Sequence, residues 1–208
     1  DSKMTYIYTL GNTKKVVNSS SVINQIHTNL SSSTFSVTNQ GSNRLYIRLI
    51  RQGQPPTGVN PPITNNPDVL AMRITYKTLK GKIITPDKLP QGTDFVAEVT
   101  LNNPGQRTNY EQMALTQIFP SGWEIINTRL SDNEGMLPTS AYAYKDIRDD
   151  RVLTYFDLRK HETRTYQVLL NASYIGRYYL PTVSCEAMYD NSIQYRLPGK
   201  WVEVIDQK

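Results

Sequence analysis

Short runs in which apolar and polar residues alternate constrain the fold of this chain more than any other feature. In one run, Phe95, Ala97, Val99 and Leu101 alternate with other residues until a turn-forming segment at 102–105 (NNPG). Successive side chains of a β-strand point to opposite faces, so this pattern predicts a strand with one buried face. Similar runs occupy residues 72–76, 113–119, 123–130, 152–158, 165–172, 178–185 and 200–205. About seven or eight strands at this spacing indicate an antiparallel β-sandwich.

The composition agrees with an all-β fold. The chain holds 14 tyrosines and 12 prolines, which favour strands and turns over helices. Its apolar fraction of 38% is lean but adequate for sheets with one wetted face. Residues 141–150 are the one segment in which we expect a short helix.

The first part of the chain has weaker β signals. Short strands are predicted at 6–10 and 15–17, separated by a Gly-Asn turn. Residues 35–38 and 45–49 also alternate, with a glycine-containing loop between them, which predicts a hairpin. Alternate residues from Leu45 to Leu49 would then share its buried face.

A proline-rich segment at residues 53–68, which we call the connector, is the clearest boundary. It contains Pro55, Pro56, Pro61, Pro62 and Pro67. Proline fixes φ and donates no backbone hydrogen bond, so the connector is expected to be extended and semi-rigid. It divides the chain into a β segment at 1–68 and a β-sandwich at 69–208.

Charge, cysteine content and hydropathy exclude several classes of protein. The net charge of +5 is scattered along the chain, which favours a solvated surface over a nucleic-acid footprint. A single cysteine permits no internal disulfide. No apolar run approaches the ~18 residues that a membrane-spanning helix needs. We therefore expect no nucleic-acid partner and no direct membrane insertion.

The residues that could carry catalysis or bind a metal are few. His27 and His161 lie in different polar segments, and neither has a second ligand at metal-binding spacing. No phosphate-binding glycine loop, nucleophile elbow or zinc-protease motif occurs. Cys185 lies in a predicted strand, where cysteines are usually buried and inert. The sequence predicts neither an enzyme nor a cofactor.

An acidic cluster is the best argument for an enzyme. It consists of Asp146, Arg148, Asp149, Asp150 and Arg151. Paired carboxylates can perform acid–base chemistry. Here each carboxylate has an arginine close by, which lowers carboxyl pKa values and favours a structural ion-pair cluster. An enzyme that uses Asp149 and Asp150 would instead require an open cleft around them.

Four tyrosines near the end of the chain support an alternative function. Tyr178, Tyr179, Tyr189 and Tyr195 would stack sugars or bases if they shared one sheet face. Tyrosines also cover sheet surfaces or lie at protein interfaces. The alternative is therefore a cell-surface β-sandwich module that binds carbohydrate or protein through a tyrosine-rich face.

Ordered motifs in the second part resemble one protein family, the bacterial alpha-2-macroglobulins. Residues 119–125 (FPSGWEI) are similar to the family's LPSGFEIENP stretch, and residues 148–151 to its RDDR segment. Residues 176–181 (GRYYLP) and 186–189 (EAMY) resemble its GRFxLPP…ExMY ending. Trp123 departs from the usual phenylalanine or leucine. The segment ending in 53–55 (GQP) resembles the part of the family before this domain, which ends in GxP.

The resemblance implies a domain organisation. Residues 69–208 look like the C-terminal macroglobulin-like domain, an antiparallel β-sandwich. Residues 1–68 look like the latter part of the CUB-like β domain, into which a helical thioester domain is inserted. The reactive Cys-x-Glu-Gln motif does not occur in this chain, because Cys185 is followed by Glu-Ala-Met.

The resemblance also implies a function for one residue pair. In this family, a broad-spectrum protease trap, the Met-Tyr pair of the last domain presses on the thioester and excludes water. That assigns a shielding role to Met188 and Tyr189. The implied partners are the thioester domain and other macroglobulin-like domains of the parent, and target proteases through the parent. The expected location is the bacterial periplasm or cell envelope, in defence, and the parent is a candidate lipoprotein.

Overall fold

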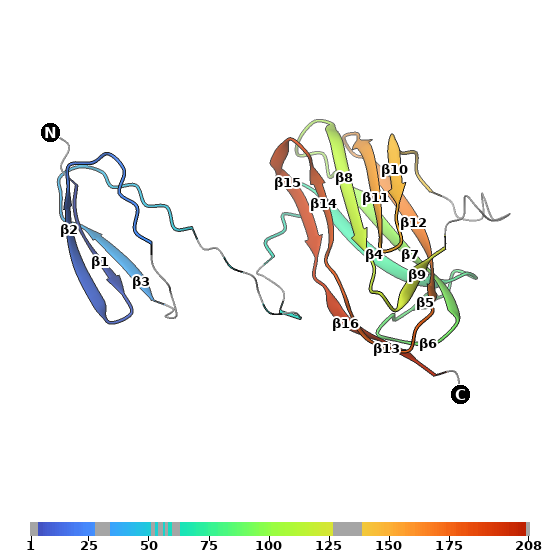
Figure 1. Cartoon of the computed structure of the whole chain (residues 1–208). Helices are drawn as coiled ribbons and strands as arrows, with labels where there is room; N and C mark the ends of the chain where they lie inside the picture. Colours follow the sequence, from blue (N-terminus) through green and yellow to red (C-terminus); the bar gives the residue numbers. More distant parts are fainter. Residues whose placement is uncertain are drawn as a thin grey trace. The chain divides into compact units, whose positions relative to one another are not determined.

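The computed structural model describes residues 4–27, 34–50, 53, 56, 58–59, 63–126 and 139–206. Its regular elements are all β-strands, which confirms the all-β prediction. No described residue lies in a helix long and apolar enough to cross a membrane. The chain forms two compact units, Asp1–Gly53 and Gln54–Lys208 (Figure 1), and each is described by itself.

The first unit contains a three-stranded antiparallel sheet in the order β2-β1-β3. Its strands are β1 (Met4–Leu10), β2 (Thr13–Ser19) and β3 (Phe35–Asn39). Tyr6 and Tyr8 on the central strand are 7% and 8% exposed, because alternate positions of β1 share its covered face. The expected turn at Gly11 is present, with a φ of 55° that glycine adopts without strain.

The hairpin predicted between residues 35–38 and 45–49 is wrong. β3 pairs with β1, from Tyr6 opposite Asn39 to Leu10 opposite Phe35. The Asn39 side chain accepts a hydrogen bond from the Gly41 N–H and donates one to the Asn43 carbonyl, which turns the chain away from β3. Residues 44–50 form no strand, and the expected core residues Ile47 and Leu49 are 57% and 62% exposed.

The second unit is a β-sandwich with two five-stranded antiparallel sheets. In one sheet the order of the strands is β5 (Ile83–Ile84), β4 (Ala71–Thr78), β7 (Thr93–Asn102), β12 (Thr163–Ala172) and β9 (Trp123–Ile125). In the other sheet the order is β10 (Tyr144–Ile147), β11 (Arg151–Leu158), β8 (Tyr110–Ile118), β14 (Val183–Ala187) and β15 (Asp190–Leu197). This confirms the predicted sandwich.

A third, smaller sheet extends one end of the sandwich. It consists of β13 (Gly176–Leu180), β16 (Lys200–Ile205) and β6 (Lys88–Pro90), in the order β13-β16-β6. β13 and β16 are antiparallel, whereas β16 and β6 are parallel. The parallel pair is the one exception to the antiparallel pattern among the strands the structure describes.

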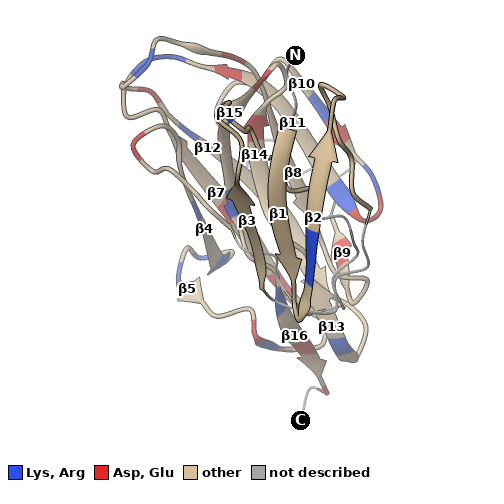
Figure 2. Cartoon of the chain, turned by 90° about the vertical axis from the view of Figure 1, so that its left-hand side faces the viewer, with Lys and Arg blue, Asp and Glu red and all other residues tan. Residues whose placement is uncertain are grey.

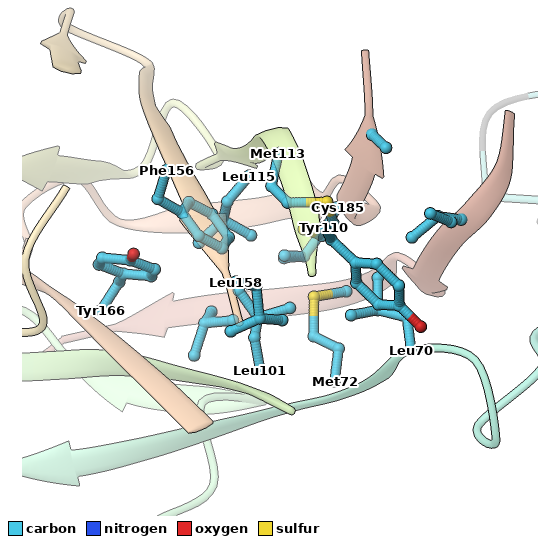
Figure 3. Close-up of a cluster of buried hydrophobic side chains, with 14 of the residues drawn as sticks. Leu70, Met72, Leu101, Tyr110, Met113, Leu115, Phe156, Leu158, Tyr166 and Cys185 are labelled. Atoms are coloured by element: carbon cyan, nitrogen blue, oxygen red, sulfur yellow. The ribbon is translucent and has the colours of Figure 1, made fainter. Parts of the chain in front are cut away.

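Two buried clusters fill the sandwich. The first contains Met72 and Leu101 from one sheet and Met113, Phe156 and Cys185 from the other, and Figure 3 shows these side chains meeting between the strands. The second is formed around a different set: Phe95, Trp123, Val152, Leu170 and Val204. The alternating run from Phe95 to Leu101 therefore faces inward, as its pattern predicts, and each fully buried leucine or valine contributes roughly 1.5–3 kcal/mol.

Two polar side chains interrupt the inner face of the second sheet. Gln117 and Thr154 are 0% and 1% exposed. Gln117 lies opposite Val152, and Thr154 lies opposite Leu115, so the two polar residues are diagonal neighbours on β8 and β11. Neither the amide of Gln117 nor the hydroxyl of Thr154 has a hydrogen-bond partner among the described residues.

Residues 176–205 form a long bent hairpin, which we call the arm. β13 continues into β14 after a bend at Pro181-Thr182, and β15 continues into β16 after a bend at Pro198-Gly199 (Figure 1). The predicted single strand at 178–185 is therefore two strands, because Pro181 donates no hydrogen bond at the bend. The bend leaves no room for a side chain at residue 199, because a Cβ added to Gly199 would clash with the Leu180 carbonyl oxygen at 2.6 Å.

The helix expected within residues 141–150 is also wrong. Strand β10 occupies that segment and pairs with β11, from Tyr144 opposite Tyr155 to Ile147 opposite Val152. The Arg148 N–H donates to the Arg151 carbonyl, closing a tight turn between the two strands. Pairing across the turn therefore overrides the weak local helix preference.

The last part of the strand predicted at 123–130, from residue 127, lies outside the described residues.

Candidate functional site at a hairpin tip

Met188 and Tyr189 form the turn at the end of the arm, between β14 and β15. We call this pair the hairpin tip. Ala187 lies opposite Asp190 and closes the turn. Met188 is 50% exposed and Tyr189 is 81% exposed, so both side chains project from the end of the sandwich. An apolar pair this exposed is available to contact another surface.

The backbone of the tip is tied to the neighbouring strand. The Met188 N–H donates a 3.1 Å hydrogen bond to the Gln112 carbonyl. Gln112 has a φ of 53°, an uncommon left-handed conformation for a residue other than glycine. Its own N–H donates a 2.8 Å bond to the carboxylate of Asp157, which holds it in that conformation. The tip is thereby fixed relative to β8 and β11.

A second set of contacts braces the start of β15. Asp190 Oδ1 accepts hydrogen bonds from the Ser192 N–H at 2.9 Å and from its hydroxyl at 2.5 Å. Arg107 Nη1 donates to Asp190 Oδ2 at 3.2 Å and to Ser192 Oγ at 2.8 Å. The bonds from the Ser192 hydroxyl and N–H, followed by the Arg107 charge, lower the pKa of the Asp190 carboxyl. Asp190 is therefore ionised at neutral pH and connects the tip to the loop that carries Arg107.

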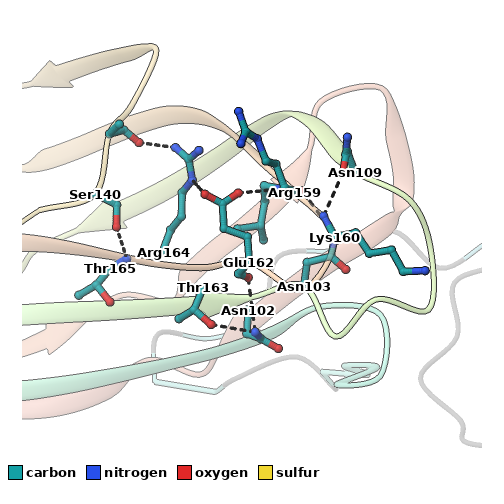
Figure 4. A network of polar contacts seen from close by, with 12 residues as sticks. Asn102, Asn103, Asn109, Ser140, Arg159, Lys160, Glu162, Thr163, Arg164 and Thr165 are labelled. Carbon is teal, nitrogen blue, oxygen red and sulfur yellow. Dashed lines mark hydrogen bonds and ion pairs between the residues drawn. The ribbon is translucent and has the colours of Figure 1, made fainter.

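That loop is organised by a buried asparagine. Asn103 is 0% exposed; its side chain donates to the Thr108 carbonyl and accepts from the Gly105 N–H. The backbone N–H of Asn103 donates to the Glu162 carbonyl. This bond joins the loop to the turn between β11 and β12 (Figure 4). In that turn Glu162 pairs with Arg164 at 3.0 Å. The loop, the turn and the hairpin tip thus share one end of the sandwich.

The base of the tip is apolar and closely packed. Cys185, Ala187 and Ile193 are buried in the first core cluster together with Met113. Burial raises the pKa of the Cys185 thiol far above its ordinary value, and the nearby Glu186 charge raises it further. Cys185 is 0% exposed, so its thiol is neutral and inaccessible, and it is not placed to act as a nucleophile.

The four tyrosines of the alternative function do not share one face. Tyr178 and Tyr179 are consecutive on β13 and therefore point to opposite sides. Tyr178 packs against the second core cluster. The ring of Tyr179 instead packs against Trp201, with 5.5 Å between the two ring centroids. Tyr195 packs against the first cluster, and only Tyr189 of the four is strongly exposed. These four tyrosines therefore do not form a shared platform.

The acidic cluster forms two separate ion pairs at the turn between β10 and β11. Arg148 Nε lies 2.9 Å from Asp146 Oδ2, and Arg151 donates two hydrogen bonds, of 2.8 and 2.6 Å, to Asp150. The bonds from Arg151, followed by its charge, lower the pKa of Asp150. Asp149 is exposed in the turn. A carboxyl with a lowered pKa is a poor general acid, so the geometry favours a structural role.

The other charged residues of the described ranges are mixed in sign. Figure 2 shows lysines and arginines interspersed with aspartates and glutamates. Within the described ranges, no group of three or more His, Cys, Asp and Glu residues is placed to hold a metal ion. The exposed tip and its braces are therefore the best candidate for a functional surface.

Comparisons with known proteins connect the second unit to one family. A family model described as the bacterial alpha-2-macroglobulin MG10 domain matches residues 71–191. An alpha-2-macroglobulin of Rickettsia conorii is 26% identical over 160 residues, covering 74% of this chain and 8% of that protein. One of Pasteurella multocida is 25% identical over 120 residues, covering 58% of this chain and 6% of that protein. The chain thus spans only a small part of these curated relatives.

Solved structures agree on the fold. Native Escherichia coli alpha-2-macroglobulin matches with a TM-score of 0.63 and 18% identity, covering 98% of this chain and 13% of that one. Salmonella alpha-2-macroglobulin reacted with methylamine matches with the same TM-score of 0.63 and 18% identity, covering 97% and 13%. At this identity the likeness concerns the fold alone.

Proposed function

The chain belongs to the bacterial alpha-2-macroglobulin MG10 domain family, and from this premise we propose that Met188 and Tyr189 shield a thioester carried by another domain of the parent protein. In this proposal the parent is a broad-spectrum protease trap of the bacterial periplasm or cell envelope. The second unit is a non-enzymatic packing domain. Its partners are the thioester domain and other macroglobulin-like domains of the parent, which alone contacts the target proteases.

The observation that carries the proposal is the exposure of the tip on a rigid support. Tyr189 is 81% exposed, yet the backbone beneath it is fixed by the Met188–Gln112 hydrogen bond and by the Arg107–Asp190 pair. A surface held in its binding conformation loses little conformational entropy on contact. The tip therefore has the rigidity that a docking surface needs.

The chemistry of the two side chains suits the role. A thioether is flexible and polarisable, and it fills irregular space beside a second surface. An aromatic ring adds a large, rigid apolar area with few rotatable bonds. Together they would keep water and small nucleophiles away from a thioester, which an aqueous nucleophile otherwise opens.

The test uses the parent protein with Met188→Gly and Tyr189→Gly combined. We expect its thioester to react with methylamine several times faster than in the wild type, because the reagent no longer has to displace the tip. The reaction is followed through the thiol that it releases. Met188→Leu with Tyr189→Phe keeps the apolar bulk and should react at close to the wild-type rate.

A second control separates shielding from a general effect of glycine. Leu79 is 59% exposed in a turn away from the tip, and Leu79→Gly should leave the methylamine rate unchanged. If the double glycine variant also reacted at the wild-type rate, the shielding role would be excluded while membership of the family would stand.

A further inference from the structure

The connector contacts the β-sandwich that follows it at two defined places, both next to the bend at Pro198-Gly199 of the arm. Asn65 contacts Arg196, at the end of β15, and Gly58 contacts Trp201, at the start of β16. These contacts belong to the second unit, which begins at Gln54. They involve neither the hairpin tip nor its braces.

The first contact caps one residue at a strand edge. β15 is the terminal strand of its sheet, so at alternate residues its N–H and C=O groups point away from β14. The Asn65 side chain donates a 2.8 Å hydrogen bond to the Arg196 carbonyl and accepts a 2.9 Å bond from the Arg196 N–H. A primary amide has the donor and acceptor of a peptide group. Asn65 therefore takes the place of a neighbouring strand at this residue.

The second contact requires glycine. Gly58 has a φ of 88°, and a Cβ added to it would lie 2.8 Å from Trp201 Nε1. The indole is held in place by Tyr179 and by Arg177, whose guanidinium carbon lies 4.7 Å from the ring centroid. The backbone at Gly58 thus lies directly against an aromatic ring that is packed on its other sides by Tyr179 and Arg177.

The end of the connector is anchored as well. The Asn66 carbonyl accepts hydrogen bonds from the N–H groups of Val69 and Leu70, and both of these side chains are buried in the first core cluster. The Val69 carbonyl accepts a 2.6 Å bond from the Tyr110 hydroxyl. The connector therefore approaches the sandwich along a fixed route from Asn65 onward.

We propose that the outer edge of β15 and the exposed side of Trp201 form an interaction surface for an extended segment, and that the connector of this chain occupies it through Asn65 and Gly58. Occupancy holds the connector beside the bend of the arm and caps β15 at Arg196, whose outer N–H and C=O would otherwise be open to pairing with a strand from another molecule. The fit is specific, because one point needs a side-chain amide and the other needs a residue without a Cβ.

The first test measures hydrogen exchange of the Arg196 amide in the full chain with Asn65→Ala. We expect exchange about tenfold faster than in the wild type, because the variant removes the acceptor of that N–H. Thr64→Ala changes the exposed neighbouring residue and should leave the rate unchanged. The buried amide of Leu115 reports global unfolding and should exchange equally slowly in all three proteins.

The second test concerns the other contact. In Gly58→Ala, the indole N–H signal of Trp201 should shift in an NMR spectrum, because the added methyl group displaces the connector from the ring. The indole signal of Trp123, which is 3% exposed in the second core cluster, should not shift. The proposal is overturned if the Arg196 amide of the Asn65→Ala variant exchanges at the wild-type rate, or if Gly58→Ala leaves the Trp201 signal unchanged.

Discussion

The two units show what the same alternating pattern produces with and without a second layer. In the second unit two sheets cover each other, and every apolar residue of the run from Phe95 to Leu101 is 3% exposed or less. In the described part of the first unit, one sheet buries Tyr6 and Tyr8, while Val16 on β2 stays 60% exposed. Alternation therefore predicts a strand, but burial of its apolar face also requires a facing surface.

The largest expected effect comes from deleting apolar side chains in the two units. Leu101→Ala removes a side chain that is 0% exposed and should lower the free energy of unfolding of the second unit by about 2–5 kcal/mol. Ile47→Ala, at a residue 57% exposed, should change the stability of the first unit by about 0.5 kcal/mol or less. Chemical denaturation followed by NMR signals of each unit measures both. Equal losses would show that the first unit buries Ile47 in solution.

The second largest effect should be a difference between the two units in how their stability responds to acid. After Asp1 the first unit contains no aspartate or glutamate, whereas Glu98 and Asp190 of the second have lowered pKa values. The hydrogen bond from Lys77 is the main cause for Glu98. Stability from a lowered carboxyl pKa is present above the unfolded value of about 4 and is lost as the pH falls through the folded value.

The second unit should accordingly lose stability as the pH is lowered from about 5 toward about 2, while the first unit keeps its spectrum. An acid titration followed through backbone amide signals checks this residue by residue. Glu98→Gln should flatten the response of the second unit, because the group that is protonated has been removed. Acid unfolding of the first unit before the second would contradict the expectation.

The smallest expected effect concerns Gln117, a polar side chain buried in the core of the sandwich. Gln117→Leu replaces a buried amide that has no hydrogen-bond partner among the described residues with an apolar side chain of similar length. We expect the second unit to gain roughly 1 kcal/mol, because an unpaired buried amide is costly. Thr116→Val, on the opposite face of the same strand, is the matched control. A clear loss of stability would mean that the amide is hydrogen-bonded to solvent inside the core.

Local sequence predicted the strands of the sandwich well and the irregular parts poorly. The runs at 152–158 and 165–172 became β11 and β12, because their alternating residues face a second sheet. β15 was missed, since its sequence DNSIQYRL is too polar to show the pattern. The hairpin to residues 45–49 and the helix within 141–150 failed where pairing with another strand decided the structure.

The site was predictable only in part. Met188 and Tyr189 were singled out by resemblance to a family and not by any local physical signal. Their braces were missed, because Arg107 and Asp190 are 83 residues apart in the sequence. The spacing of Asp190 and Ser192 is the one local clue, since an aspartate often binds the backbone N–H two residues later.

The continuity of the arm has a mechanical consequence. β16 is hydrogen-bonded to β13 along its length, and through the bend it leads directly to β15 and the hairpin tip. Hydrogen bonds between antiparallel strands lie at right angles to the strands. A pull along β16 would therefore load these bonds in shear, all at once, instead of opening them one by one. The arm can transmit tension to its tip without first unzipping.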